Sequence, residues 1–113
     1  MSRAIRFAAE EVRIVASGAV GAPYSTVGDP MTHPIRTIIF QNTMDTGLML
    51  SFDGVTDHLP IITNGYMAID IASNKTSPQG FYLAEGQQIF VRQLGGVPSS
   101  GSLYVSVFYG AEI

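Results

Sequence analysis

Short runs in which apolar and other side chains alternate one by one constrain this chain more than any other feature. The clearest runs lie at 48–53, 66–71 and 103–109. In the last run, Leu103, Val105 and Val107 fall on one face of a pleated strand. A period of two is typical of strands, whereas an amphipathic helix repeats every 3.6 residues. The chain is therefore predicted to be all-β.

Turn-forming residues separate these runs and set the expected architecture. The chain has 12 glycines and 6 prolines, and Asp53-Gly54 and Asn64-Gly65 suit tight turns. Such spacing favours an antiparallel β-sandwich or jelly roll of about 7–8 strands. Further strands are expected in the segments Ile5–Ala9, Val12–Ala16, Ile35–Gln41, Phe81–Leu83 and Ile89–Leu94.

Two segments invite more specific expectations. A helical turn competes with a strand in the alanine-rich stretch Phe7–Ala16. The polar link Asn42–Gly47 lies between two strong strands and is predicted to close a hairpin.

The length of 113 residues suits one domain. We divide it into residues 1–34, an extended N-terminal arm with the first strands, and residues 35–113, the β-sandwich core. Prolines at 23, 30 and 34 make Gly18–Pro34 either a long irregular connection or part of that arm.

The composition excludes several classes of partner. Charged residues are 13% of the chain, against about 25% in an average soluble domain. We interpret this deficit as a sign that part of the surface is covered in use. The six basic residues are scattered and the net charge is −3, which argues against nucleic acid. No stretch is apolar enough for a membrane helix and no signal peptide is visible, so we expect neither membrane nor secretion.

No catalytic or cofactor-binding residues are expected, and the chain is predicted not to be an enzyme. It has no cysteine and no Gly-x-Ser-x-Gly elbow. The weak candidates for a metal site are Asp53, Asp57 and Asp70. A metal-dependent enzyme centred on Asp53, Asp57 and His58 is the remote alternative; His33 and His58 are otherwise ordinary loop or surface residues.

Several strands are apolar on both faces, which predicts either central strands or strands covered by another subunit. The assembly-interface candidates are Ile38, Phe40, Phe90, Tyr104 and Phe108. Exposed aromatic rings also suit stacking on sugars. The candidate platforms for that alternative are Tyr24, Tyr66, Tyr82 and Tyr104.

Four segments of the chain also carry a family resemblance. They are the hairpin-like Phe40–Gly54, the Leu-Pro-Ile that follows it, Ala68–Lys75 and Gly101–Gly110. Together they resemble small virion structural proteins of tailed bacteriophages. The resemblance implies a β-sandwich or jelly-roll module, present in many copies on the capsid or at the neck and tail, and it implies no active-site residue.

The resulting expectation is a bacteriophage virion structural protein without enzymatic activity. Its partners are further copies of itself and other virion proteins, with no nucleic acid, membrane, small-molecule substrate or cofactor. It is made in the host cytoplasm and used in the virion. The alternative is a β-sandwich that binds a carbohydrate or host receptor.

Overall fold

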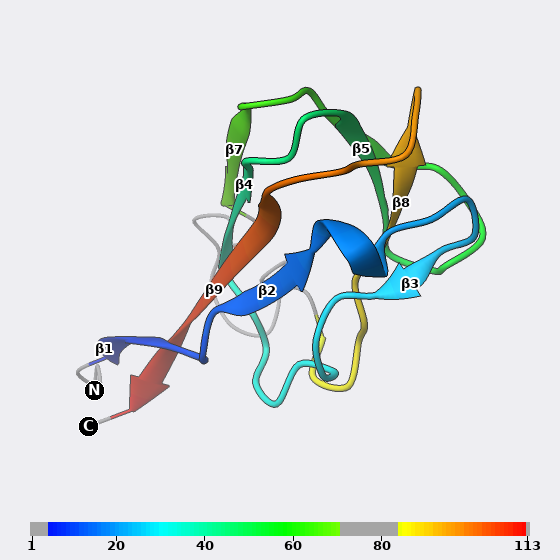
Figure 1. Ribbon diagram of the computed structural model, residues 1–113. Helices are drawn as coiled ribbons and strands as arrows, with labels where there is room; N and C mark the ends of the chain where they lie inside the picture. The colour runs from blue at the N-terminus through cyan, green and yellow to red at the C-terminus, as the bar shows by residue number, and fades with distance from the viewer. Residues whose placement is uncertain (1–4, 71–83, 113) are drawn as a thin grey trace.

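The chain is all-β and forms two antiparallel sheets (Figure 1). The computed structural model describes residues 5–70 and 84–112. Their elements are β1 (Ile5–Ala9), β2 (Arg13–Ala16), the 3-10 turn η1 (Ser17–Ala19), β3 (Ser25–Thr26), β4 (Thr37–Asn42), β5 (Gly47–Ser51), β6 (Leu59–Ile61), β7 (Tyr66–Asp70), β8 (Phe90–Leu94) and β9 (Ser102–Glu112). In this part of the chain, no helix has the length and hydropathy to cross a membrane.

Each sheet draws strands from distant parts of the sequence. Sheet A has the order β1-β9-β4-β7, and β2 pairs with the same strand β9 as β1 does. Sheet B has the order β3-β8-β5-β6. β9 is long enough for β2 to pair with Ser102–Val105 and for β1 to pair with Phe108–Glu112. β1 and β2 therefore lie end to end along one edge of sheet A.

The two sheets share one apolar core. Alternate residues of β4, β5 and β9 are fully buried, and on β5 and β9 the alternation in the sequence predicts this burial. Phe40 is the largest of these side chains and is opposite Val105 of β9. The core members are Val15, Val20, Val27, Met31, Ile35, Ile38, Phe40, Met44, Leu48, Leu50, Ile61, Ile89, Val91, Leu103, Val105 and Val107.

The described part of the N-terminal segment is bound to the rest of the domain. In the stretch predicted as a connection or arm, Val20, Val27 and Met31 belong to the core. Backbone bonds from Val27 N to Ile89 O (2.8 Å) and from Met31 N to Gln87 O (2.9 Å) tie this stretch to the region around β8. The prolines exclude long strands here, but the valines and the methionine still gain by burial.

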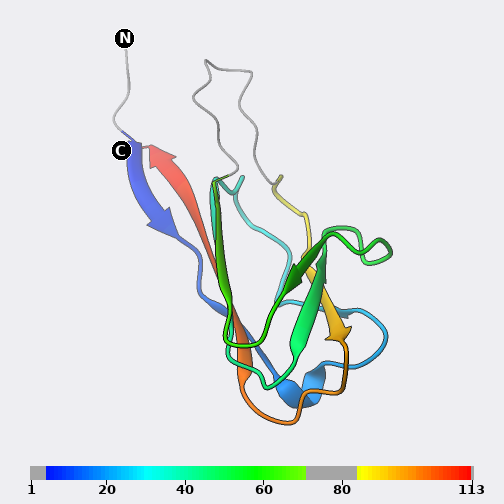
Figure 2. The ribbon, with the colours of Figure 1, turned by 90° about the horizontal axis from the view of Figure 1, so that it is seen from above.

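One pair of strands does extend beyond the body of the domain. Figure 2 shows β1 and the end of β9 continuing side by side past the other strands. The register joins Ile5 to Glu112 and Ala9 to Phe108. Strands, with no helix, form in the described part of the alanine-rich stretch.

The hairpin predicted at Asn42–Gly47 is wrong. β4 lies in sheet A and β5 in sheet B, so this link crosses from one sheet to the other. Buried Met44 and the Asn42 side chain hold the crossing: Asn42 Nδ2 donates to the carbonyl oxygens of Thr46 (3.1 Å) and Ile62 (3.1 Å). Burial of Met44 outweighs the local turn chemistry. The strand expected at Phe81–Leu83 lies outside the described residues.

Candidate functional site

The face of sheet A turned away from the core is the candidate site, and we call it the outer face of sheet A. On β4, Ile38 and Phe40 point into the core, so Ile39 and its alternate neighbours point outward. The strand register carries this alternation across the sheet. The outer face consists of Ile14 and Ala16 of β2, Ser102, Tyr104, Ser106 and Phe108 of β9, Thr37, Ile39 and Gln41 of β4, and Tyr66, Ala68 and Asp70 of β7.

Large apolar side chains are exposed at both ends of a row that crosses this face. Ile14 pairs with Tyr104, Tyr104 with Gln41, and Gln41 with Tyr66. Ile14 is 57% exposed and Tyr66 is 76% exposed. Among the residues named above as the outer face, Asp70 alone carries a charge. The outer face of sheet A is thus a broad, nearly uncharged surface.

The prediction that Ile38 and Phe40 lie at an assembly interface is wrong. Both are fully buried between the sheets, with no exposed surface. The strand is apolar on both faces at Ile38–Phe40, so the alternation could not tell which set points inward. Ile39 is the outward, half-buried residue, and it has Ser106 and Ala68 as its cross-strand neighbours.

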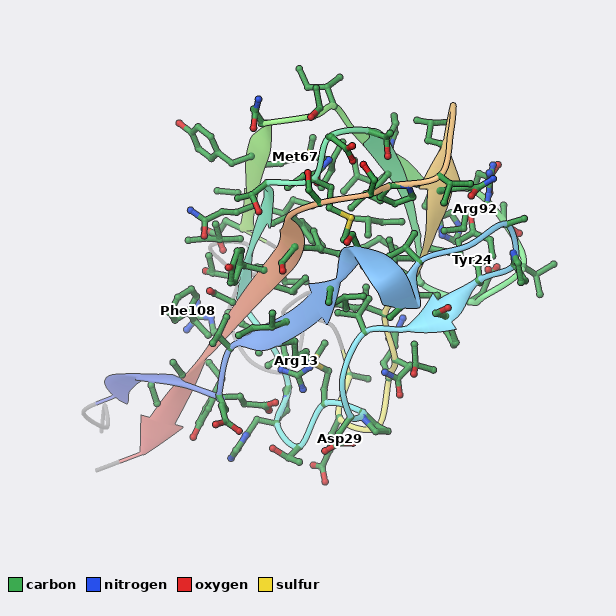
Figure 3. The ribbon with its side chains drawn as sticks, viewed as in Figure 1. Arg13, Tyr24, Asp29, Met67, Arg92 and Phe108 are labelled. Atoms are coloured by element: carbon green, nitrogen blue, oxygen red, sulfur yellow. The ribbon has the colours of Figure 1, made fainter. Side chains whose placement is uncertain are left out.

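The other candidates fall on two different surfaces. Tyr104 and Phe108 are half-buried on the outer face of sheet A, where Figure 3 shows Phe108 on the far side of the molecule from Tyr24 and Arg92. Phe90 belongs to the outer face of sheet B. A Cβ on Gly54 would lie 3.2–3.3 Å from the Phe90 ring, so the loop at 52–58 covers that phenyl group.

The outer face of sheet B is also closed by an ion pair. Asp57 accepts hydrogen bonds from Arg92 Nε (3.0 Å) and Nη2 (2.5 Å) and from the Tyr24 hydroxyl. Hydrogen bonds from Arg92 and then Tyr24 lower the pKa of Asp57 to about 2. The Arg92 guanidinium also lies 5.8 Å from the centre of the Tyr24 ring. Tyr24, a predicted sugar platform, is thus committed to contacts within the domain.

The weak metal candidates do not converge. Asp53 Oδ1 accepts from the backbone N–H groups of Val55 and Thr56, both at 2.8 Å, and from Ser51 Oγ at 2.8 Å. These bonds hold the pKa of Asp53 well below its ordinary value and explain the residue as a turn former. Asp57 pairs with Arg92, and Asp70 lies in β7 of the other sheet. Within residues 5–70 and 84–112, no three His, Asp or Glu side chains are grouped to hold a metal.

Sequence reasoning missed an open cavity of about 410 Å³, lined by both polar and apolar groups, between β1 and β2. Glu10 organises its wall: the carboxylate accepts from Arg13 Nη2 (2.8 Å) and from the backbone N–H (3.0 Å) and hydroxyl (2.9 Å) of Thr32. His33 Nδ1 lies 2.9 Å from the same carboxylate, and its ring stacks on Tyr109 at 3.7 Å. Burial raises the pKa of Glu10, but these hydrogen bonds outweigh burial and lower it to about 2. These five side chains come from three separate parts of the sequence and match no known motif, so the sequence does not indicate the cavity.

Comparisons with protein-family models, with curated proteins and with solved structures find no match to this chain.

Proposed function

We propose that the chain is a jelly-roll β-sandwich. The support is the nesting of its strand pairs, with β1 and β2 counted as one interrupted strand. The strands pair from the ends inward: β1 and β2 with β9, β3 with β8, β4 with β7, and β5 with β6. A long antiparallel ribbon that folds up into two four-stranded sheets gives this order. A jelly roll consists of eight strands arranged in two Greek keys.

The proposed function is that of a bacteriophage virion structural protein, a non-enzymatic module that assembles in multiple copies on the capsid or at the neck or tail. The outer face of sheet A carries this proposal. Exposed apolar faces on small domains mark surfaces that another protein covers. The resemblance of residues 36–110 to small phage virion proteins suggests that this assembly is a virion. Jelly rolls are also common among viral capsid domains.

The N-terminal arm of the proposal is shorter than residues 1–34. Within residues 13–34, β2 pairs with β9, β3 pairs with β8, and Val20, Val27 and Met31 pack in the core, so this stretch is part of the sandwich. β1, paired with the end of β9, is the described segment that extends from the body toward a neighbouring copy.

Size-exclusion chromatography with light scattering on the full chain tests the assembly. We expect a mass that is a multiple of the 12.1 kDa protomer at micromolar concentration. A monomer at high micromolar concentration that also fails to bind other virion proteins contradicts the proposal.

The alternative, carbohydrate or receptor binding, is favoured by the cavity at Glu10 and His33. Its volume lies within the range of small-molecule sites, and the wall combines a stacked ring with fixed polar groups. A glycan array read with the intact chain and with His33→Ala decides this alternative. Signals that vanish with the variant support it, and an array without signal removes it.

A further inference from the structure

We propose that two copies of this chain pair face to face through the outer face of sheet A, about a twofold axis that lies between the two facing sheets, parallel to them and at right angles to the strands. The inference rests on the proposed assembly in multiple copies and adds the surface and the symmetry by which two copies meet. Three properties of this face support the inference: its exposed apolar residues, its lack of charge, and the way rows of large and small side chains alternate on its surface.

The exposed large apolar residues that lie within strands are both on this face. Six large apolar side chains are exposed among the described residues: Val12, Ile14, Val55, Ile62, Tyr66 and Val97. Val12, Val55, Ile62 and Val97 lie between strands, where isolated exposure is ordinary. Ile14 and Tyr66 lie within strands on opposite sides of sheet A, joined by the row through Tyr104 and Gln41. A partner that lies flat across four strands covers both.

The charge distribution selects a second copy as that partner. In a twofold contact each residue near the axis meets the same residue of the other copy, so any charge there faces its like. The residues that define the outer face, from β2 across β9 and β4 to β7, are uncharged except Asp70, at the edge strand β7. The chain as a whole has a net charge of −3, so two copies meet with the least local repulsion where the facing surfaces carry no charge. A strongly basic or acidic partner, by contrast, finds almost no charge to pair with on this face.

The relief of the face is self-complementary. The row Ile14, Tyr104, Gln41 and Tyr66 is made mostly of large side chains. The adjacent row has Ser106 and Ala68 on either side of Ile39. A twofold axis between these two rows places the large row of each copy over the smaller row of the other. Tyrosine and serine hydroxyls and the Gln41 amide supply hydrogen-bonding groups within an otherwise apolar contact.

Tyr66→Lys and Ile14→Lys test the surface. The matched control is Ile62→Lys, because Ile62 is as exposed as Tyr66, at 76%, and lies in the turn before β7 rather than on the face. All three variants change the net charge equally. Sedimentation equilibrium should show the dimer dissociation constant rising by at least about tenfold for the two face variants and by less than about twofold for the control. Two face variants on different strands keep the test valid if one fails to fold, which thermal unfolding monitors.

A crosslinking experiment tests the symmetry. The chain has no cysteine, so Ser106→Cys and the control Val55→Cys each carry a single thiol. Ser106 lies in a row beside the twofold axis, so the two copies of Ser106 come within reach of one short crosslinker, whereas Val55 lies in the loop over the other sheet. A short bismaleimide should therefore crosslink Ser106→Cys to dimers and leave Val55→Cys as monomers.

The outcomes separate this inference from the function on which it rests. If the wild-type chain associates and neither Tyr66→Lys nor Ile14→Lys weakens the association, the pairing through sheet A is overturned while assembly in multiple copies stands. If the face variants lose binding to a different virion protein and the wild-type chain alone stays monomeric, the second copy is the wrong occupant. If the wild-type chain neither self-associates nor binds virion proteins, the proposed function itself fails.

Discussion

Both sheets have large apolar residues on their outer faces, but these residues are covered on sheet B and exposed on sheet A. On sheet B, the loop at 52–58 folds over Phe90, and Asp57 of that loop pairs with Arg92 of β8. On sheet A, Ile14 and Tyr66 remain largely exposed in the described structure. Figure 3 places the labelled residues Tyr24 and Arg92 on one side of the molecule and Phe108 on the other.

This difference shows that an outward apolar residue has two quite different explanations. Phe90 of sheet B is satisfied within its own chain, because Gly54 allows the backbone to approach the ring closely. Ser51 is fully buried on that same outer side for the same reason. The outer face of sheet A has no such loop among the described residues. Only an outward apolar residue that its own chain leaves exposed is evidence for a partner.

The largest expected effect contrasts the two sides of β4. Phe40→Ala removes a fully buried side chain from between the sheets and should lower the free energy of unfolding by about 3–5 kcal/mol. Ile39→Ala, on the outer side of the same strand, should cost about 1 kcal/mol. Urea denaturation of both variants at low protein concentration measures the contrast. Equal costs, or a Phe40→Ala variant that is stable but no longer associates, would show that the inner and outer sides of β4 have been exchanged.

A smaller effect is expected where the loop covers sheet B. Gly54 has a φ of 78° and a Cβ there would press on Phe90 at 3.2 Å, whereas Gly95 has a φ of 86° and nothing within 4 Å. Both alanine variants incur the left-handed backbone cost of about 1–2 kcal/mol. Gly54→Ala should lose about 1 kcal/mol more, because the Phe90 ring must shift. Thermal unfolding of the pair measures the excess, and equal losses would indicate that the loop does not rest on Phe90.

The smallest effect concerns the ion pair on sheet B. The folded pKa of Asp57, about 2, lies below its ordinary value of 3.8. Ionised Asp57 therefore stabilises the fold above pH 4, and this contribution is lost as the pH falls toward 2. The pair is largely exposed, so its contribution is small.

The difference in melting temperature between the wild-type chain and Asp57→Asn isolates this carboxylate from the other acids. It should be positive at pH 5 and shrink toward zero at pH 2. A difference that does not change with pH contradicts the ion pair.

Several strands were predictable because their signal is local. The segment Ile5–Ala9 matches β1, and the alternation at 103–109 lies within β9. β3, with two residues, and β6, which contains Pro60, were missed because neither has length or alternation to reveal it. Their strand character comes from pairing with β8 and β5.

The site was less predictable than the strands. Tyr104 and Phe108 were correctly placed opposite the core set of β9, because Leu103, Val105 and Val107 are the more uniformly aliphatic set. On β4, the apolar residues Ile38, Ile39 and Phe40 follow one another without alternation, and the choice of Ile38 and Phe40 as outward residues was wrong. The network of Glu10 with Arg13, Thr32 and His33 joins residues up to 23 positions apart, a proximity that no short motif encodes.

The sequence alone determined the period of the strands, and hence an all-β chain, because side-chain alternation follows from backbone geometry. The tertiary structure decided which face of each strand is inside, that residues 42–47 change sheets, and which outward residues are covered. These are consequences of long-range packing: burying Phe40, Met44 and Val27 together fixes the position of the sheets, and no single segment contains that information. The alternating runs of the sequence thus give information about a partner only on sheet A, where the outward-facing residues stay exposed.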